Sequence, residues 1–355
     1  MALKLGLNLG YWGIGPQGDD AVEIVRAAEA AGFDSVWAAE SYGSDVVSVL
    51  AWLAPQTETI KLGAAIMQVP ARPPAAAAMA GATIDALSGG RFIFGFGPSG
   101  PQVSEGWYGV PYEKPWGRTR EYIEIVREIV AREGKLEHRG EHYQLPIEGG
   151  TGQGKPLKLN FHPVRSEIPV FVGAIGRKSV EMAAEICDGW IPIFFSADAF
   201  EETWGEHLEA GFAKGGRSRE DLEVSPSLQV AIDGDLDAAR SVVRAGLMLY
   251  LGGMGSRKTN FYVDLTHRFG FGEVADEVQS LYLDGKRDEA YQAIPDELVD
   301  ATSLVGSESE VAERIEKLAA AGVDRLICSP VHLDPAQRLH TVERLSELAG
   351  VASPA

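Results

Sequence analysis

A sequence pattern recurs along the chain and limits the folds that are available. It consists of a predicted helix, a short stop of small residues that ends the helix, and a buried strand. The stop is Ala31-Gly32-Phe33-Asp34 near the N-terminus and Ala321-Gly322-Val323-Asp324 near the C-terminus, and apolar strands are predicted directly after them, at 35–39 and 325–329. A weaker copy precedes a predicted strand at 190–193. The glycine supplies the left-handed C-cap that ends each helix. Helices that alternate with buried strands are typical of an α/β protein with a parallel sheet.

Eight strand candidates alternate with helical patterns along the whole chain. They are predicted at 3–9, 35–39, 60–66, 91–96, 168–172, 190–193, 224–232 and 325–329. Eight such units favour a (β/α)8 barrel over a doubly wound sheet. No linker divides the chain in the middle, so residues 1–355 are predicted to form one barrel domain.

Two segments are longer than an ordinary connection between a strand and a helix, and both are predicted to be insertions. Residues 133–167 are rich in Gly, Pro and His and have no helical period, whereas residues 252–302 look partly helical. Insertions of this kind often build active-site walls or subunit contacts.

The composition argues against several classes of function. The chain has 32 Lys and Arg residues against 51 Asp and Glu residues, which gives a formal net charge of −19. Nucleic-acid binding needs a basic face that releases phosphate counterions, and anionic membranes attract basic segments. The two cysteines, Cys187 and Cys328, form no CxxC pair, and the sequence has no secretion signal and no long apolar stretch. We therefore expect a cytoplasmic protein with two buried thiols that binds neither nucleic acid nor membrane.

Motifs for metal or nucleophilic catalysis are missing from the sequence. It contains no HExxH motif, no cluster with metal-ligand spacing and no GxSxG nucleophile elbow. His138 and His142 are four residues apart, but the glycine between them argues against a helix that would join them at a metal. No metal is therefore expected. A glycosidase pair of carboxylates stays open, because its members would meet only in space.

The clearest ligand signal is a glycine-containing turn that runs into a helix. In a barrel, ligands bind at the carboxyl ends of the strands, and Gly173-Ala174-Ile175-Gly176-Arg177 follows the fifth predicted strand. Free N–H groups and the positive end of the helix dipole favour an anion there. Arg177 and Lys178 add charge. A plain tight turn is the alternative interpretation.

A second glycine-rich loop and a set of aromatic residues also follow predicted strands. In the loop 95–100 the backbone could approach a flat ring or a phosphate closely, or it could simply turn. The aromatic residues could wall a pocket for a planar cofactor, or they could belong to the core or the rim. They are Tyr11, Trp12, Tyr42, Trp107 and Tyr108.

Three phrases together are similar to a known superfamily. They are AAEAAGFDSVWAAESYGSD at 27–45, LGAAIMQVPARPPAAAAMAGATIDALSGGRFIFGFGPSGPQVSEGWYG at 62–109 and IPVFVGAIGRKSVEMAAEICDGWIPIF at 168–194. The chain resembles the bacterial luciferase-like superfamily, and within it the branch that uses the deazaflavin coenzyme F420. Methylenetetrahydromethanopterin reductase and F420-dependent glucose-6-phosphate dehydrogenase are familiar members of that branch.

The resemblance implies a (β/α)8 barrel with insertions, a homodimer and a cofactor that lies across the strand ends. It also implies a non-prolyl cis peptide at the end of the third strand, and the matching bond is Ala65–Ile66. The cofactor phosphate is expected at the turn from Gly173 to Arg177. By position, the cofactor contacts implied are Glu40, Ala65, Ile66, Gln68, Phe96, Gly97, Ser99, Gly173, Ala174, Ile175, Gly176 and Arg177.

Two residues depart from the pattern of the resembling enzymes. Relatives that oxidise sugars or alcohols usually have a His where this chain has Ser41, and the glucose-6-phosphate enzymes have a Glu where it has Pro98. Two proton-transfer groups are thus missing, although a reductase needs only one proton donor. Glu40 is the predicted polar partner near the cofactor ring, and Tyr11 or Tyr42 are the alternative donors.

The function predicted from the resemblance is hydride transfer between F420 and an apolar or heterocyclic organic substrate. An FMN-dependent luciferase-like monooxygenase is the first alternative. A barrel that binds a cofactor without turnover is the second, and the missing His and Glu motivate it. Because the net charge is −19, an anionic cofactor needs a local positive pocket, for which Arg72, Arg177 and Lys178 are the predicted residues.

Overall fold

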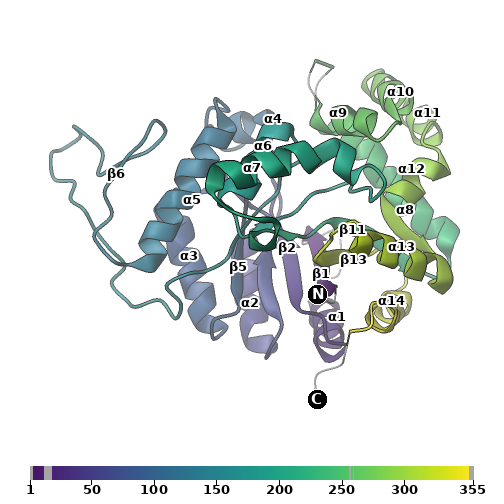
Figure 1. Ribbon diagram of the computed structural model, residues 1–355, viewed down its shortest axis with the longest axis horizontal. Coiled ribbons are helices and arrows are strands. Elements are labelled where there is room, and N and C mark those ends of the chain that lie inside the picture. Colours follow the sequence, from purple (N-terminus) through teal and green to yellow (C-terminus); the bar gives the residue numbers. More distant parts are fainter. Residues whose placement is uncertain (1–2, 12–17, 256, 259, 352–355) are drawn as a thin grey trace.

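The computed structural model describes residues 3–11, 18–255, 257–258 and 260–351. Its main element is a curled parallel sheet with helices on its outer side (Figure 1). The strands of this sheet are β1 (Lys4–Tyr11), β2 (Ser35–Ala39), β3 (Lys61–Ala64), β4 (Met67–Gln68), β5 (Phe92–Gly97), β8 (Val170–Val172), β9 (Gly189–Trp190), β10 (Glu223–Val224), β11 (Ser227–Ile232), β12 (Ser303–Gly306) and β13 (Arg325–Pro330). Their order is β10-β9-β8-β5-β3-β2-β1-β13-β11-β12, and β4 pairs with β5. The α/β class predicted from the sequence is therefore confirmed.

A break at Pro226 divides the seventh predicted strand into β10 and β11. Proline has no N–H to donate to a ladder. On one side of the break, β10 pairs with β9, and on the other, β11 pairs with β13 and β12. The N–H of Ser225 donates to the carbonyl of Trp190 (2.8 Å), and the N–H of Asp324 donates to that of Val224 (2.9 Å). Backbone hydrogen bonds thus reach from β10 to both sides of the curled sheet.

The strand β12 is missing from the sequence prediction. It follows the 252–302 insertion directly and pairs with β11. A run of 4 residues, Ser-Leu-Val-Gly, is too short for periodicity to separate a strand from the end of a helix. The sheet therefore has more strands than the eight that were predicted.

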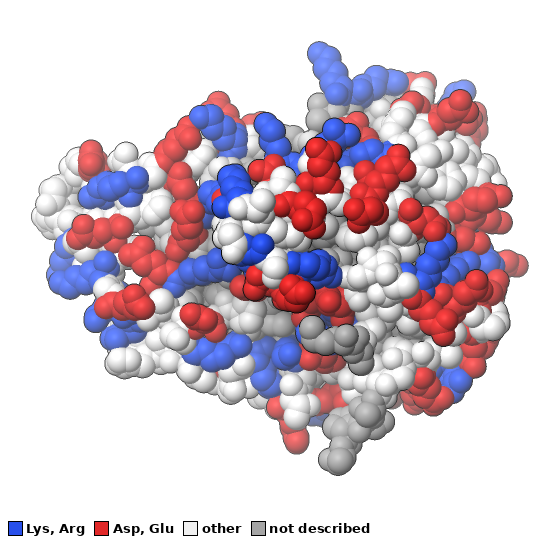
Figure 2. All heavy atoms as spheres, in the orientation of Figure 1, with Lys and Arg blue, Asp and Glu red and all other residues white. Residues whose placement is uncertain are grey.

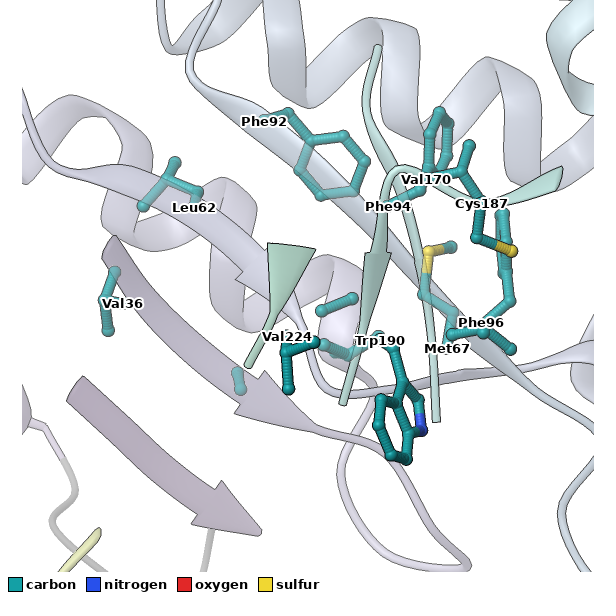
Figure 3. Close-up of a cluster of buried hydrophobic side chains, with 14 of the residues drawn as sticks. Val36, Leu62, Met67, Phe92, Phe94, Phe96, Val170, Cys187, Trp190 and Val224 are labelled. Atoms are coloured by element: carbon teal, nitrogen blue, oxygen red, sulfur yellow. The ribbon is translucent and has the colours of Figure 1, made fainter. Parts of the chain in front are cut away.

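Helices follow most strands, and several of them cover the outer side of the sheet. They are α1 (Asp19–Ala30), α2 (Val46–Leu53), α3 (Pro74–Leu87), α4 (Pro101–Gly106), α5 (Pro115–Ala131), α6 (Arg177–Ile186), α7 (Glu206–Gly215), α8 (Leu236–Met248), α9 (Phe261–Arg268), α10 (Gly272–Leu283), α11 (Arg287–Gln292), α12 (Asp296–Ala301), α13 (Glu308–Ala320) and α14 (Pro335–Leu348). A π-helical turn, η5 (Leu249–Gly253), extends α8. Side chains on the outer side of the strands pack against this layer, and Figure 3 shows Phe92, Phe94 and Phe96 of β5 in that core.

The inner side of the curled sheet has a small apolar core of its own. Trp37, Ile93, Phe171, Ile191 and Ile327 form this cluster. Because side chains alternate along a strand, these residues come from positions between those that face the helices. A Cβ on Gly63 would overlap the Trp37 ring, so this position has room only for glycine.

An ionic cluster lies near the amino ends of the strands. Arg325 is only 1% exposed and donates to Glu223 (2.5 Å), Asp34 and Ser35. Burial alone would raise the pKa of Asp34 and of Glu223. The charge and hydrogen bonds of Arg325, together with Lys61 at Asp34 and Lys4 at Glu223, lower both pKa values below their usual range.

The two insertions have different structures. The first contains a short antiparallel hairpin, β6 (His138–Arg139) with β7 (Gln144–Leu145), and extends from the body on the left of Figure 1. Glu121 of α5 accepts the backbone N–H groups of Glu141 (2.9 Å) and Tyr143 (3.0 Å), which ties the hairpin to α5. The second contains α9 to α12, which pack on α8 around a separate apolar cluster, so the prediction of partial helicity is confirmed.

One face of the molecule has charged side chains of both signs. Acidic and basic side chains are interspersed on the face shown in Figure 2. Among the described residues, no helix has both the length and the hydropathy that crossing a membrane requires.

Candidate functional site

Two glycines support the loop between β3 and β4. The peptide bond between Ala65 and Ile66 is cis, which confirms the expectation from the resemblance. A Cβ on Gly97, at the end of β5, would overlap Cδ1 of Ile66, and a Cβ on Gly173 would lie 3.1 Å from its Cγ2. The structure therefore brings together four of the predicted contact residues, Ala65, Ile66, Gly97 and Gly173, and the two glycines leave room for the Ile66 side chain.

Glu40 follows β2, and its carboxylate is fully engaged. It is 5% exposed and accepts the backbone N–H of Gln68 (2.9 Å) and two hydrogen bonds from the guanidinium of Arg72, one of them 3.0 Å long. Arg72 also donates to Asp45 (2.9 Å), and Asp45 caps α2 through the N–H of Ser48. Burial alone would lower the pKa of Arg72, but the hydrogen bonds and charges of Glu40 and Asp45 raise it. The prediction that Arg72 supplies free positive charge is wrong, because two carboxylates already neutralise it.

Gln68 links this ion pair to the loop after β5. Its amide Nε2 donates to the hydroxyl of Ser99 (2.9 Å), and the hydroxyl of Tyr108 donates to its Oε1 (3.0 Å). The hydroxyl of Tyr112, which the sequence did not single out, donates to the carbonyl of Ser99 (3.0 Å). Ser99 itself adopts a left-handed backbone with φ of 63°. A hydrogen-bonded chain thus runs from Glu40 through Gln68 to Ser99.

Phe96 is placed differently from the other predicted contacts. Its side chain is buried in the outer core, stacked on Phe94 at a centroid distance of 5.2 Å. Its carbonyl accepts the N–H of Gly173 (2.9 Å). Side chains alternate across a strand, so only the backbone of Phe96 reaches the edge where the site lies. Phe96 is therefore a poor candidate for a side-chain contact with a ligand.

The turn before α6 is held by two tryptophans. The indole N–H of Trp190 donates to the carbonyl of Ala174 (2.7 Å), and that of Trp204 donates to the carbonyl of Ile175 (3.1 Å). Gly176 is the N-cap of α6. The backbone N–H groups of Gly176 and Arg177 donate no hydrogen bond to any described residue. The turn is therefore a rigid helix N-terminus with open donors.

Arg268 of α9 lies beside this turn. Its Nη2 donates to the carbonyl of Ile175 (3.4 Å), and its Nη1 is buried with no partner among the described residues. Burial and the charge of Arg177 lower the pKa of Arg268. Arg177 and Lys178 are exposed at the start of α6. Two guanidinium groups thus flank the turn, and one of them has an unused donor.

The tyrosine at the end of β1 belongs to an aromatic cluster. Tyr11 shares a hydrogen bond with Tyr250 of η5. The Tyr250 ring lies 4.8 Å from that of Tyr262 and 5.1 Å from that of Phe194, measured between centroids. We call Tyr11, Phe194, Tyr250 and Tyr262 the aromatic wall. Burial raises the pKa of the three tyrosines in it, so their hydroxyls stay protonated at neutral pH.

The remaining predicted aromatic residues lie outside this wall. Tyr42 is 58% exposed and acts on the pKa of Tyr11. Trp107 is 67% exposed. Trp12 lies outside the described residues.

Comparisons with known proteins identify the family. The profile of the family described as luciferase-like monooxygenase matches residues 9–325. The chain belongs to the luciferase-like monooxygenase family. A protein of Mycobacterium tuberculosis that is named as a coenzyme F420-dependent oxidoreductase is 50% identical over 329 residues, which cover 92% of this chain and 94% of that protein.

Methanopterin enzymes of the same family are also similar. The 5,10-methylenetetrahydromethanopterin reductase of Archaeoglobus fulgidus is 32% identical over 326 residues, covering 90% of this chain and 92% of that protein. The structure of the coenzyme F420-dependent tetrahydromethanopterin reductase of Methanopyrus kandleri superposes with a TM-score of 0.78 at 25% identity and covers 98% of both chains.

Most of the site residues that the sequence did not predict lie in or next to the second insertion. Arg268, Tyr250 and Tyr262 lie more than 70 residues after the turn at Gly176, and no motif marks them. Their only sequence signal is position, since they belong to or adjoin an insertion after a strand end, where active-site walls are often built.

A possible cation cluster lies apart from this site. Asp233, Glu308 and His340 each offer a ligand atom within 4.8 Å of the others. However, both carboxylate oxygens of Glu308 accept hydrogen bonds from Arg344 (2.5 and 2.9 Å). We assign no metal to these residues, because the arginine already occupies the central carboxylate.

Proposed function

We propose that this protein is an oxidoreductase that transfers a hydride between coenzyme F420 and a small organic substrate. The observation on which the proposal rests is the 50% identity, over 92% of the chain, to a protein named as an F420-dependent oxidoreductase. The local structure at the carboxyl ends of the strands supports it, because its open donors and the apolar Ile66 side chain fit the parts of a deazaflavin coenzyme.

The turn before α6 fits the phosphate of such a coenzyme. The N-terminus of α6 offers open N–H donors, Arg177 is exposed beside them, and the buried Nη1 of Arg268 has no protein partner in the described part of the chain. An anion bound here would accept a hydrogen bond from the buried Nη1 of Arg268. It would also lie between the positive charges of Arg177 and Arg268 and reduce their repulsion.

The surface around Ile66 fits the flat ring system. Gly97 and Gly173 leave room for the Ile66 side chain, which forms the proposed floor, and Gln68 and Ser99 offer polar groups beside it. When bound, the coenzyme would donate or accept the hydride, and the floor would fix the distance to the substrate.

The geometry suggests different roles for the three predicted catalytic residues. Glu40 is a positioning residue in this proposal, because all its carboxylate hydrogen bonds go to Arg72 and to the backbone of Gln68. Tyr11 is the proposed proton donor, since its hydroxyl is neutral and its partner Tyr250 can orient it. Tyr42 is more exposed, so we propose that it only covers Tyr11.

Titration of the purified protein with F420 and with FMN tests the proposal. We expect F420 to bind and FMN not to compete with it. Binding of FMN alone would contradict the proposal and favour the luciferase-like monooxygenase. Binding of F420 without turnover of any substrate in a broad panel would instead favour a non-catalytic cofactor-binding barrel.

We also propose that the curled sheet is a (β/α)8 barrel with additional strands, that residues 1–355 form one domain, and that two copies associate through α2 and α3. The outer sides of these helices support a dimer. From 46 to 57 and from 73 to 90 the sole ionisable side chain is Asp85, which is buried, while Trp52, Met79 and Leu87 are exposed. In a chain with a net charge of −19, a second copy meets the least repulsion at an uncharged face. A cytoplasmic location stays a prediction.

A further inference from the structure

The inner side of the strands opposite the proposed coenzyme residues has an uncharged polar group. Asn8 of β1 donates from Nδ2 to the hydroxyls of Ser227 in β11 (3.2 Å) and Ser329 in β13 (3.0 Å). All three residues are half-buried, so solvent or a ligand reaches them. Each serine oxygen accepts from Asn8, and no acceptor for either serine proton lies within the described ranges. Both serine hydroxyls can therefore donate to a ligand.

The aromatic wall adjoins this polar group through the strand register. Ile193 forms a parallel bridge with Ser227, and the next residue, Phe194, belongs to the wall. On β1, Tyr11 lies three residues after Asn8, at the carboxyl end of the strand. The wall and the polar group are therefore neighbours along β1 and next to the bridge between Ile193 and Ser227.

The side chains of the wall and of the polar group are themselves uncharged. Tyr250 contacts Phe194 and Tyr262 through its ring, and among the described residues the side chain of Asn8 bonds only to serine hydroxyls and a backbone N–H. An anionic or cationic ligand would lose hydration here without gaining an ion pair, whereas a neutral ring could stack on the wall.

We propose that Asn8, Ser227, Ser329 and the aromatic wall form the substrate subsite, and that it takes a neutral, planar, conjugated carbonyl compound. The ring of the substrate packs on Phe194 and Tyr262, and its carbonyl oxygen accepts hydrogen bonds from the two serines. Calling the ligand a substrate rests on the proposed function. Binding at the subsite is measurable without the coenzyme.

Calorimetric titrations with three probes test the subsite in the full chain, first alone and then with saturating F420. The probes are coumarin, which is planar and neutral, coumarin-3-carboxylate, which adds a negative charge to the same ring, and cyclohexanone, which has a carbonyl but no aromatic ring. We expect coumarin to bind at least about tenfold more tightly than the other two. Equal binding of the carboxylate, or no coumarin binding in either condition, overturns the proposal.

Matched variants separate the subsite from general damage. Tyr262→Leu removes a ring and should weaken coumarin binding about tenfold, whereas Tyr262→Phe keeps the ring and should change it little. Ser329→Ala should weaken it about fivefold, and Ser280→Ala, at an exposed serine of α10, should not. An unchanged affinity in both Tyr262→Leu and Ser329→Ala overturns the assignment.

F420 binding by the same variants distinguishes the two proposals. If wild-type protein binds coumarin in this pattern but does not bind F420, the subsite is supported and the proposed function is contradicted. If the protein binds F420 but shows no preference for coumarin, the proposed function is supported and the subsite is contradicted.

Discussion

Arg72 holds Glu40 with two hydrogen bonds, one to each carboxylate oxygen, while the N–H of Gln68 occupies the same carboxylate from the other side. The ion pair therefore joins the end of β2 to the segment that follows the Ala65–Ile66 bond. The carboxylate orients the loop beneath the proposed coenzyme.

Arg72→Met should lower both stability and coenzyme affinity. It leaves the buried carboxylate of Glu40 without its cation, so we expect the free energy of unfolding in urea to fall by about 3–5 kcal/mol. F420 affinity should fall with it, because the Glu40 carboxylate that accepts the N–H of Gln68 is no longer held in position by Arg72. Lys114→Met breaks the exposed pair with Glu141 and is the control. Unchanged stability of Arg72→Met would show that the pair is not a supporting element.

Gly97→Ala should weaken coenzyme binding more than it weakens folding. The new methyl group would displace the flexible end of the Ile66 side chain, which forms the proposed floor. Gly95→Ala would instead push against the carbonyl of Ala64 and should destabilise the fold. Gly134→Ala, with no atom within 4 Å of the new Cβ, is the control. Fluorescence titration with F420 and thermal unfolding of each variant provide the readouts, and normal F420 affinity in Gly97→Ala would refute the role of this floor.

Arg268→Gln should reduce F420 affinity by about tenfold or more, because a charged donor to the phosphate is lost. The deazaflavin riboside without the phosphate should bind the variant and the wild type equally. Arg257→Gln is a matched control, since Arg257 lies in the same insertion but pairs with Asp284. If the riboside loses as much affinity as F420, Arg268 does not contact the phosphate.

Stability should depend on pH through the cluster around Arg325. The pKa values of Asp34 and Glu223 are lowered in the folded state, so their contribution is present above the unfolded values near ~4. It is lost as the pH falls through the lowered folded values. Arg325→Met should therefore cost about 3–5 kcal/mol at pH 7 and less at low pH. Urea unfolding of both proteins across the acid range measures the difference, and a cost that does not change with pH would count against this ionic cluster as its source.

Trp52→Glu combined with Met79→Glu should convert the proposed dimer to a monomer. The two carboxylates would face their copies across an uncharged contact between acidic chains. Light scattering coupled to size-exclusion chromatography measures the mass. Leu333→Glu, at another exposed apolar residue, is the control. A dimer that survives the double substitution must use another face.

Local patterns predicted the elements that depend on neighbours in the sequence. The stop at Ala31-Gly32 ends α1, and the turn at Gly176 precedes α6, because caps and periodicity are properties of short segments. The break at Pro226 is equally local, because proline has no N–H to donate to a neighbouring strand. The strand β12 was missed because four residues contain too little pattern.

Contacts between distant segments lay beyond these patterns. Arg72 looks like a free cation in the sequence, yet packing places it between Glu40 and Asp45. Arg268 looks like an ordinary helical charge, yet α9 places it against the turn at Ile175.

The sequence by itself determined the α/β class, the resemblance to the family and the helix N-terminus at Gly176. Those features depend on backbone conformation and on which face of a segment is apolar, and both are encoded locally. Only the tertiary structure decided that Arg268 stands at the phosphate turn and that Tyr250 and Tyr262 meet Tyr11. These contacts depend on how the second insertion packs on the strand ends. Packing is determined by many side chains that are distant in the sequence.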